Sequence, residues 1–362
     1  MGRTGKRECL PDILKGFAII LVVMGHCIQE GSGIAFKENS LFFQDKLYQF
    51  IYSFHMPLFM LISGYFAWYS MEKAHERKEQ WRLLGRRSLT LLLPILAWTI
   101  FDSFLVLALD GWENPVFRSV FVFCKDFAVR LVSNGWFLWA VFWCFLIVFF
   151  MHFYLRDSII LYIAGFLALF VIPDGLGLSA YKFMLPYFIS GFYFHRFRKG
   201  KLYQEKFLCV KDWMWIVLFG AVFVLLFLFF DEYSMIYLSG YKLYGKDVLR
   251  QLRIDCYRTL IGFVGSGFFI LVWRKIIKIA ENYSFPVLCA FGRNSLGIYM
   301  ISGEICLFVG LEMRGILFPN HLLNLAETVV VVGMAYVLTV FLEKIPVLRC
   351  LVGRQRRKNG GK

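Results

Sequence analysis

The sequence has few charged residues and no long polar segment. Charged side chains make up 18% of its 362 residues, whereas hydrophobic residues make up 59% and aromatic residues 19%. A soluble domain of this size does not need so much apolar surface, so the composition excludes an ordinary water-soluble globular protein. No polar stretch between the apolar runs is long enough to fold as a separate soluble domain.

The chain also lacks the motifs that mark metal, disulfide and nucleotide sites. Its nine cysteines are scattered, and no two of them form a C-x-x-C pair. Several fall inside apolar runs, where cysteine behaves as a small apolar residue, so we expect neither a metal site nor a disulfide framework. We find no glycine-rich phosphate loop and no internal repeat. The lack of inverted repeats weakens a transporter interpretation without excluding it.

What the sequence does contain is a series of apolar runs near the length of a membrane span. A bilayer core requires about 20 apolar residues per helix, so the runs predict an all-α, polytopic integral membrane protein with about ten transmembrane helices. The predicted spans are 11–30, 47–69, 88–109, 135–153, 158–173, 181–195, 213–230, 254–273, 286–309 and 326–342.

The basic residues predict the orientation of these spans. With both termini in the cytoplasm, inside segments hold 26 Lys/Arg and outside loops hold 11, counting Lys182 at the outer edge of the sixth span with the loop before it. This asymmetry is the one expected of a multi-pass protein of the cell membrane, the bacterial inner or plasma membrane. The net charge of +15 is therefore explained by topology and by contact with anionic membrane lipid, and we expect no nucleic-acid partner.

One moderately apolar segment, residues 115–133, is interrupted by Arg118, Lys125, Asp126 and Arg130. Counting it as a span would invert every later loop and spoil the charge asymmetry. We interpret it as an amphipathic helix at the outer surface.

The first span carries a cation and an imidazole on one side of its predicted helix. Lys15 and His26 are eleven residues apart, which is about three turns or roughly 16 Å along the axis. Ionisable groups inside a membrane are costly and usually face a cavity or a partner. The pair predicts a polar path, with Lys15 near the cytoplasmic end and His26 in the outer half. A structural histidine is the alternative.

Other spans also contain ionisable groups. His55, in the outer half of the second span, is either a structural histidine or a second catalytic one. Arg87, at the cytoplasmic edge of the third span, either reaches the lipid interface or forms a phosphate-binding mouth. Asp102 lies within that span and needs a partner, for which Lys15 or an internal water would serve.

The ninth span adds a cation and a carboxyl. Arg293 lies near its cytoplasmic end, where we expect a basic cluster with Lys15 and Arg87. Glu304 lies further toward the outside, where it either acts with His26 or pairs with a cation such as Arg258.

These residues, in this order and spacing, resemble the acyltransferase-3 family of integral membrane acyltransferases. The resemblance covers nearly the whole chain. It rests on Lys15 with His26, on the run Phe54-His55-Met56-Pro57-Leu58-Phe59 followed by Ser63-Gly64-Tyr65, on Arg87 with Pro94, and more weakly on Trp136-Phe137-Leu138 and on Gly292 to Tyr299.

The chain departs from the family pattern at three positions. Lys15 stands where the family usually has arginine, Thr90 where a second basic residue is common, and Ser302 where a histidine often occurs. These changes put the basic cluster and any second histidine in doubt and leave His26 intact. We assign residues 1–345 to the family's transmembrane domain and residues 346–362 to a basic cytoplasmic tail.

The resemblance implies transfer of an acyl group, commonly acetyl from cytoplasmic acetyl-CoA, to a hydroxyl of a cell-envelope or lipid-linked glycan. His26, with His55 and Glu304 as further candidates, would be catalytic, either as general base or as acyl carrier. Lys15, Arg87, Arg293, Asn294 and Ser295 would bind the polyanionic donor, and no metal is required. A glycolipid or polysaccharide transporter or flippase remains the alternative, with a non-catalytic envelope assembly protein as a third class.

Overall fold

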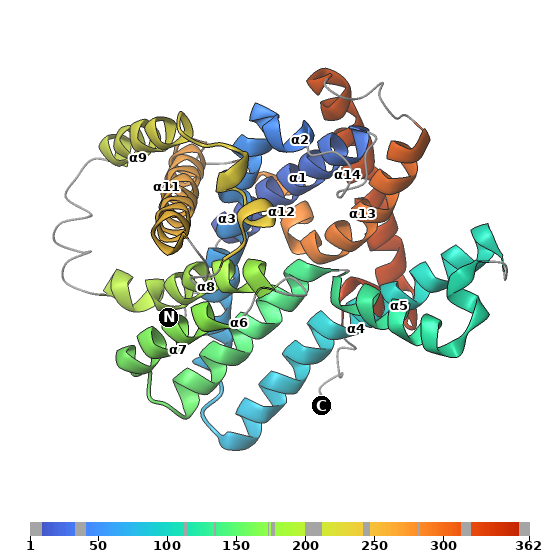
Figure 1. The fold of residues 1–362 in the computed structure, drawn as a ribbon. Helices are drawn as coiled ribbons and strands as arrows, with labels where there is room; N and C mark the ends of the chain where they lie inside the picture. Colours follow the sequence, from blue (N-terminus) through green and yellow to red (C-terminus); the bar gives the residue numbers. More distant parts are fainter. Residues whose placement is uncertain are drawn as a thin grey trace.

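The computed structural model describes residues 9–32, 41–111, 114–133, 135–172, 174, 178–199, 212–241, 247–280, 283–312 and 320–354. All regular secondary structure in these ranges is helical (Figure 1). The α-helices are α1 (Leu10–Gly31), α2 (Leu41–Gln44), α3 (Lys46–Met71), α4 (Arg77–Asp110), α5 (Val120–Ser133), α6 (Trp136–Phe153), α7 (Ile159–Val171), α8 (Leu178–Lys199), α9 (Asp212–Phe227), α10 (Ile236–Ser239), α11 (Val248–Ile279), α12 (Pro286–Arg293), α13 (Ser295–Glu312) and α14 (His321–Lys344). Three short 3-10 turns, η1 (Pro115–Arg118), η3 (Glu232–Ser234) and η4 (Leu348–Val352), join them.

The all-α, polytopic fold predicted from the sequence is confirmed. In the described ranges, six helices are long and apolar enough to cross a membrane, namely α1, α3, α4, α6, α11 and α14. The remaining predicted spans correspond to α7, α8, α9 and the pair α12–α13. At 1.5 Å per residue, the 13 residues of α7 extend about 20 Å, which is less than the roughly 30 Å of a bilayer core.

Helices α4 and α11 are longer than predicted, and the predicted ninth span consists of two helices. Helix α4 has 34 residues and begins at Arg77, where Glu76 and Glu79 form a capping box. Arg87 therefore lies well inside a helix instead of at its start. Helix α11 extends to 32 residues. The predicted ninth span is broken at Asn294 into α12 and α13.

The segment predicted to lie on the outer surface forms η1 and α5. No residue of α5 is buried, and Val120 and Phe121 are 81% and 77% exposed. The main packing partners of helix α5 are α4, α6 and η1. The helix projects from the bundle in Figure 1. An apolar helix that packs so little against the protein fits the predicted position at a lipid surface.

Helices α1 and α3 form the centre of the bundle (Figure 1). Two thirds of the most apolar window of each is buried, against 22–39% in the other four long helices. Helix α1 packs on α3, α12, α13 and α14, and α3 packs on α8 and α11. Two ionisable residues of these helices, Asp12 of α1 and His55 of α3, are buried in protein at 3% and 2% exposure.

Glycines let the central helices touch their neighbours backbone to backbone. A Cβ at Gly64 of α3 would collide with the carbonyl of Phe188 in α8, and a Cβ at Gly191 of α8 would collide with the carbonyl of Leu61 in α3. Close packing at small residues is a main source of helix association in lipid. Gly64 and Gly191 therefore hold α3 and α8 together at close range.

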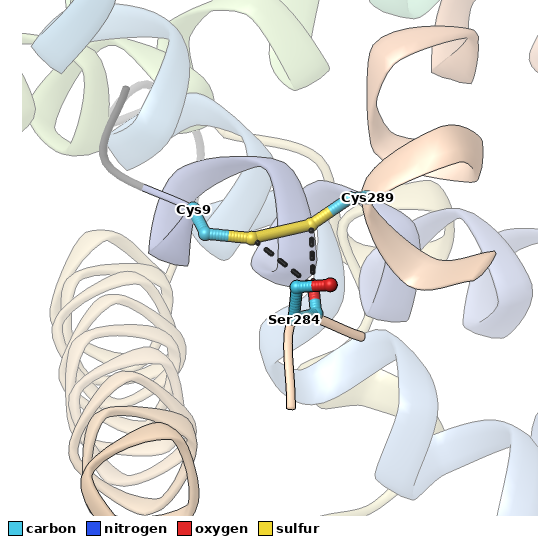
Figure 2. Close-up of a disulfide and its surroundings, with 3 residues drawn as sticks. All are labelled: Cys9, Ser284 and Cys289. Atoms are coloured by element: carbon cyan, nitrogen blue, oxygen red, sulfur yellow. Dashed lines mark hydrogen bonds between the residues drawn. A yellow bond between two sulfur atoms is a disulfide. The ribbon is translucent and has the colours of Figure 1, made fainter. Parts of the chain in front are cut away.

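Helix α12 contacts the start of α1 through glycines, backbone to backbone, and a disulfide joins the same two regions. Gly16 faces the carbonyl of Leu288, and Gly292 faces the carbonyl of Asp12. Cys9 and Cys289 are joined by a disulfide, and both sulfurs lie 3.4 Å from the carbonyl oxygen of Ser284 (Figure 2). The expectation of no disulfide framework did not foresee this single bond, because residues 280 positions apart meet only in the folded chain.

The glycine contact between α3 and α8 predicts a stability difference. Gly64→Ala should lower the free energy of unfolding by about 1–3 kcal/mol, because the methyl group meets a backbone carbonyl that cannot move aside. Thermal unfolding of the purified protein in detergent measures it. Gly85→Ala in α4, where a Cβ meets no atom within 4 Å, is the control and should not lower the melting temperature. Equal melting temperatures for the two variants would contradict the packing argument.

The charge asymmetry predicts the orientation of each loop, and reporter fusions test it. Fusions should report outside at Lys37, Lys242 and Arg314 and inside at Arg77, Lys201 and Lys358; all of these except Arg77 lie outside the described residues. An inverted signal from Lys201 onward would show that residues 115–133 cross the membrane.

Candidate functional site

A cavity of about 170 Å³ lies between α1, α3, α4, α6, α8 and α13. Most of its wall is apolar, from residues such as Phe59, Phe137 and Phe188. Its polar lining consists of Lys15, Ser63, Arg87, Thr90, Ser295 and Tyr299. An apolar cavity with a few convergent polar groups is the usual form of a small-molecule site.

Helix α1 supplies one wall of this cavity through residues at heptad spacing. Lys15, Ile19 and Val22 all line it, and His26 occupies the next position of the same stripe, one turn beyond Val22. The Lys15 ammonium nitrogen lies 4.1 Å from the centre of the Phe66 ring, a cation–π contact. The predicted shared face of Lys15 and His26 is thus present, and the cavity lies along it.

Arg87 reaches the same cavity from α4. Its guanidinium donates a hydrogen bond to the Ser70 hydroxyl (3.0 Å), and its central carbon lies 5.8 Å from the centre of the Phe145 ring. The side chain is half-buried. Lys15 and Arg87 therefore both line this cavity, and each lies against an aromatic ring.

The third predicted member of the basic cluster lies elsewhere. Arg293, the last residue of α12, is exposed and does not line the cavity. Asn294 bonds the carbonyl of Ala290 through its amide nitrogen (2.9 Å) and accepts a bond from Arg354 (3.1 Å). The sequence predicted Arg293, Asn294 and Ser295 as donor-binding residues, and only Ser295 lines the cavity. The helix breaks at Asn294, and Ser295 is the first residue of α13.

The two histidines predicted for the outer half are close enough to interact electrostatically. His55 is 2% exposed, and its Nδ1 donates to the carbonyl of Ile51 (2.7 Å). This bond places the lone pair of the neutral imidazole on Nε2. His26 is half-buried. The Tyr52 ring contacts both regions. Its centre lies 4.6 Å from the centre of the His55 ring, and the ring packs against Gly25, the residue before His26.

Glu304 has a different partner from those predicted. Its side chain hydrogen-bonds Asp102, which is 9% exposed, so two carboxyl groups from α13 and α4 share one site. Two carboxyl groups within hydrogen-bond distance require a proton between them. The alternative that pairs Glu304 with a cation such as Arg258 was wrong, whereas action of Glu304 with His26 stays a prediction. Arg258 instead pairs with Asp255 in its own helix (2.7 Å).

In the described part of the chain, no group of three or more His, Cys, Asp or Glu side chains is placed to hold a metal ion.

Two of the residues that depart from the family pattern can be placed in the structure. Thr90 lines the cavity, and Ser302 is fully buried, with its hydroxyl donating to the carbonyl of Tyr299 (3.3 Å).

The sequence argument missed three residues of this site. Ser63 and Tyr299 line the cavity, and Ser70 holds Arg87. The helical spacing of Met56, Phe59, Ser63 and Phe66 along α3 was a usable signal for the first of these. Nothing in the sequence pairs Ser70 with Arg87, because the two lie on different helices.

Comparison with known proteins agrees with this architecture. The nodulation protein NolL of Mesorhizobium japonicum is 25% identical to this chain over 307 residues, covering 83% of the chain and 77% of that protein. The nodulation protein NolL of Sinorhizobium fredii is 34% identical over 190 residues, covering 52% of the chain and 49% of that protein. No solved structure matches the chain.

The family comparison covers the whole bundle. The sequence model of the acyltransferase domain matches residues 11–344, from the start of α1 to the end of α14. The match therefore includes every residue of the cavity and both histidines. The chain belongs to the acyltransferase-3 family, and the protein is a multi-pass membrane acyltransferase.

Proposed function

We propose that this acyltransferase moves an acetyl group from acetyl-CoA, arriving on the cytoplasmic side, to a hydroxyl of a cell-envelope or lipid-linked glycan on the other side. Family membership supports acyl transfer. One observation supports the direction: a single stripe of α1 runs from Lys15 through the cavity lining at Ile19 and Val22 to His26. Because the chain is an acyltransferase, the transporter alternative is set aside.

The donor end of this path has the chemistry to hold coenzyme A. Lys15 and Arg87 would contact its phosphates, because both are cations of the cavity lining and lie in the halves of α1 and α4 predicted to be nearer the cytoplasm. The apolar wall would accept the acyl end of the donor, and the Ser295 hydroxyl would bond its polar atoms. Arg293 and Asn294 would contribute from outside the cavity, beside Arg354.

The acceptor end has the groups for proton transfer. In the proposed step, His26 takes the proton of the glycan hydroxyl while the hydroxyl oxygen attacks the thioester carbonyl. The carbon–sulfur bond breaks, the new oxygen–carbon ester bond forms, and the proton taken by His26 passes to the coenzyme A thiolate, which restores the neutral imidazole. His26 as a transient acyl carrier gives the same products through two steps. His55 and the Glu304 carboxyl are the further groups proposed to act in proton transfer.

The direct test is acetyl transfer by membranes that contain the protein. Labelled acetyl-CoA added to inside-out vesicles should give labelled acetyl that hydroxylamine releases from the glycan fraction. Vesicles from cells without the protein are the control. Label that stays in coenzyme A or appears only as free acetate would contradict the proposal.

Removal of a cavity cation should weaken donor binding. Arg87→Ala should raise the apparent KM for acetyl-CoA about 10-fold or more, because a charge-assisted contact is worth roughly 1.5–3 kcal/mol. Lys15→Ala should act in the same direction. Initial rates against acetyl-CoA concentration measure both effects.

The matched control for this prediction is Lys15→Arg. It should keep most of the activity, since arginine retains the charge and also stacks on an aromatic ring such as Phe66. A normal KM for acetyl-CoA in Lys15→Ala would show that Lys15 is not part of the donor site.

Removal of the imidazole should abolish most of the transfer. His26→Ala should lower the rate per folded molecule by about 10²–10⁴-fold, the usual contribution of general acid–base assistance. His26→Gln should fail to a similar extent, because an amide hydrogen-bonds but does not exchange a proton near neutral pH. The measurement is the transfer rate divided by the amount of folded protein.

His55→Gln is the comparison variant. Its amide can still donate to the Ile51 carbonyl, so a structural His55 predicts near-normal transfer in this variant. Near-normal turnover in His26→Gln would remove His26 from the mechanism and direct attention to His55 and Glu304.

A further inference from the structure

Helix α14 carries two buried polar side chains that have no partner within the described part of the chain. Asn324 is fully buried, and neither its amide nitrogen nor its amide oxygen has a hydrogen-bond partner there. Glu327, one turn along, is 9% exposed, and both of its carboxylate oxygens are likewise unpartnered. Leaving such groups unsatisfied costs about 1–3 kcal/mol each, and more for a charge. A membrane protein keeps them at that cost where they meet a ligand.

These two side chains lie near the acceptor end of the proposed path. Glu327 lies beside Cys27 of α1, the residue after His26. The Cys27 thiol interacts with the Glu327 carboxylate and lies 3.7 Å from the sulfur of Cys306. A thiol is one weak donor, so it leaves most of the acceptor capacity of the carboxylate unused. Helix α14 packs along both α1 and α13 at this level.

Glu30 of α1 lies near Glu327 of α14 and near Tyr52 of α3. Glu30 follows His26 by one turn on α1 and interacts electrostatically with both Tyr52 and Glu327. Tyr52 in turn contacts His55. Glu327 is therefore near Glu30 and, through Tyr52, near His55, and it lies beside Cys27, which follows His26 in the sequence.

We propose that Asn324 and Glu327 form a recognition subsite for the hydroxyl groups of the acceptor sugar, beside His26. A carboxylate accepts two O–H bonds, and an amide both donates and accepts one, so the pair matches neighbouring hydroxyls of a saccharide. A hydroxyl held there would orient the adjacent one toward the imidazole. This inference rests on the proposed function and adds to it the residues that select the acceptor.

The experiment compares Asn324→Leu and Glu327→Gln with Thr328→Val in the vesicle assay for labelled acetyl. Loss of hydrogen bonds to a polar acceptor should lower transfer roughly 10–100-fold in each of the first two variants. The apparent KM for acetyl-CoA should stay within about twofold, because neither residue lines the cavity that holds the proposed donor cations Lys15 and Arg87. Thr328 is the matched control: it is buried on the same helix, but its hydroxyl already bonds the Asn324 carbonyl (2.6 Å).

Thermal unfolding of the purified variants separates recognition from packing. If Asn324 has no protein partner, Asn324→Leu should melt at or above the temperature of the unsubstituted protein, because it removes an unsatisfied buried amide. A lower melting temperature with unchanged transfer per folded molecule would overturn the proposal, as would unchanged transfer alone. A matching rise in the KM for acetyl-CoA would also overturn it. Absence of any transfer by the unsubstituted protein would instead count against the proposed function itself.

Discussion

Backbone contact at glycine holds the two central helices, and the position of each polar group in the candidate site depends on it. Gly64 and Gly191 join α3 to α8, and Gly16 and Gly292 join α1 to α12. In lipid, apolar side chains gain little by leaving the solvent for another helix, so close van der Waals contact does much of the work of association. Fixing α1 and α3 in this way fixes the face that carries Lys15 and the turn that carries His55.

The charged side chains inside the bundle have different partners at the cavity and away from it. Away from the cavity they are neutralised in place: Lys182 pairs with Asp174 (2.9 Å), and Arg258 pairs with Asp255 (2.7 Å). At the cavity, Lys15 lies against an aromatic ring, and Arg87 bonds the Ser70 hydroxyl. The cation–π contact and the hydroxyl contact hold these two side chains in the lining of one cavity.

The helical elements could be predicted because their signal is local. Runs of apolar residues and the 3.6-residue period place α1, α3, α6 and α14 close to their observed limits. The same period puts Lys15 and His26 on one face without any knowledge of neighbouring helices. The start of α4 was missed because polar residues from Arg77 onward form helix beyond the apolar run that a hydropathy argument detects.

What the sequence alone determined is therefore the membrane class, the helices and the shared face of Lys15 and His26, since each follows from composition or from spacing within one segment. Only the tertiary structure decided which distant groups meet: Cys9 with Cys289, Asp102 with Glu304, and Arg87 with Ser70. These pairings depend on how helices pack, and packing is set by contacts such as that between Gly64 and Phe188, which join residues far apart in the chain. A spacing rule within one helix carries no information about them.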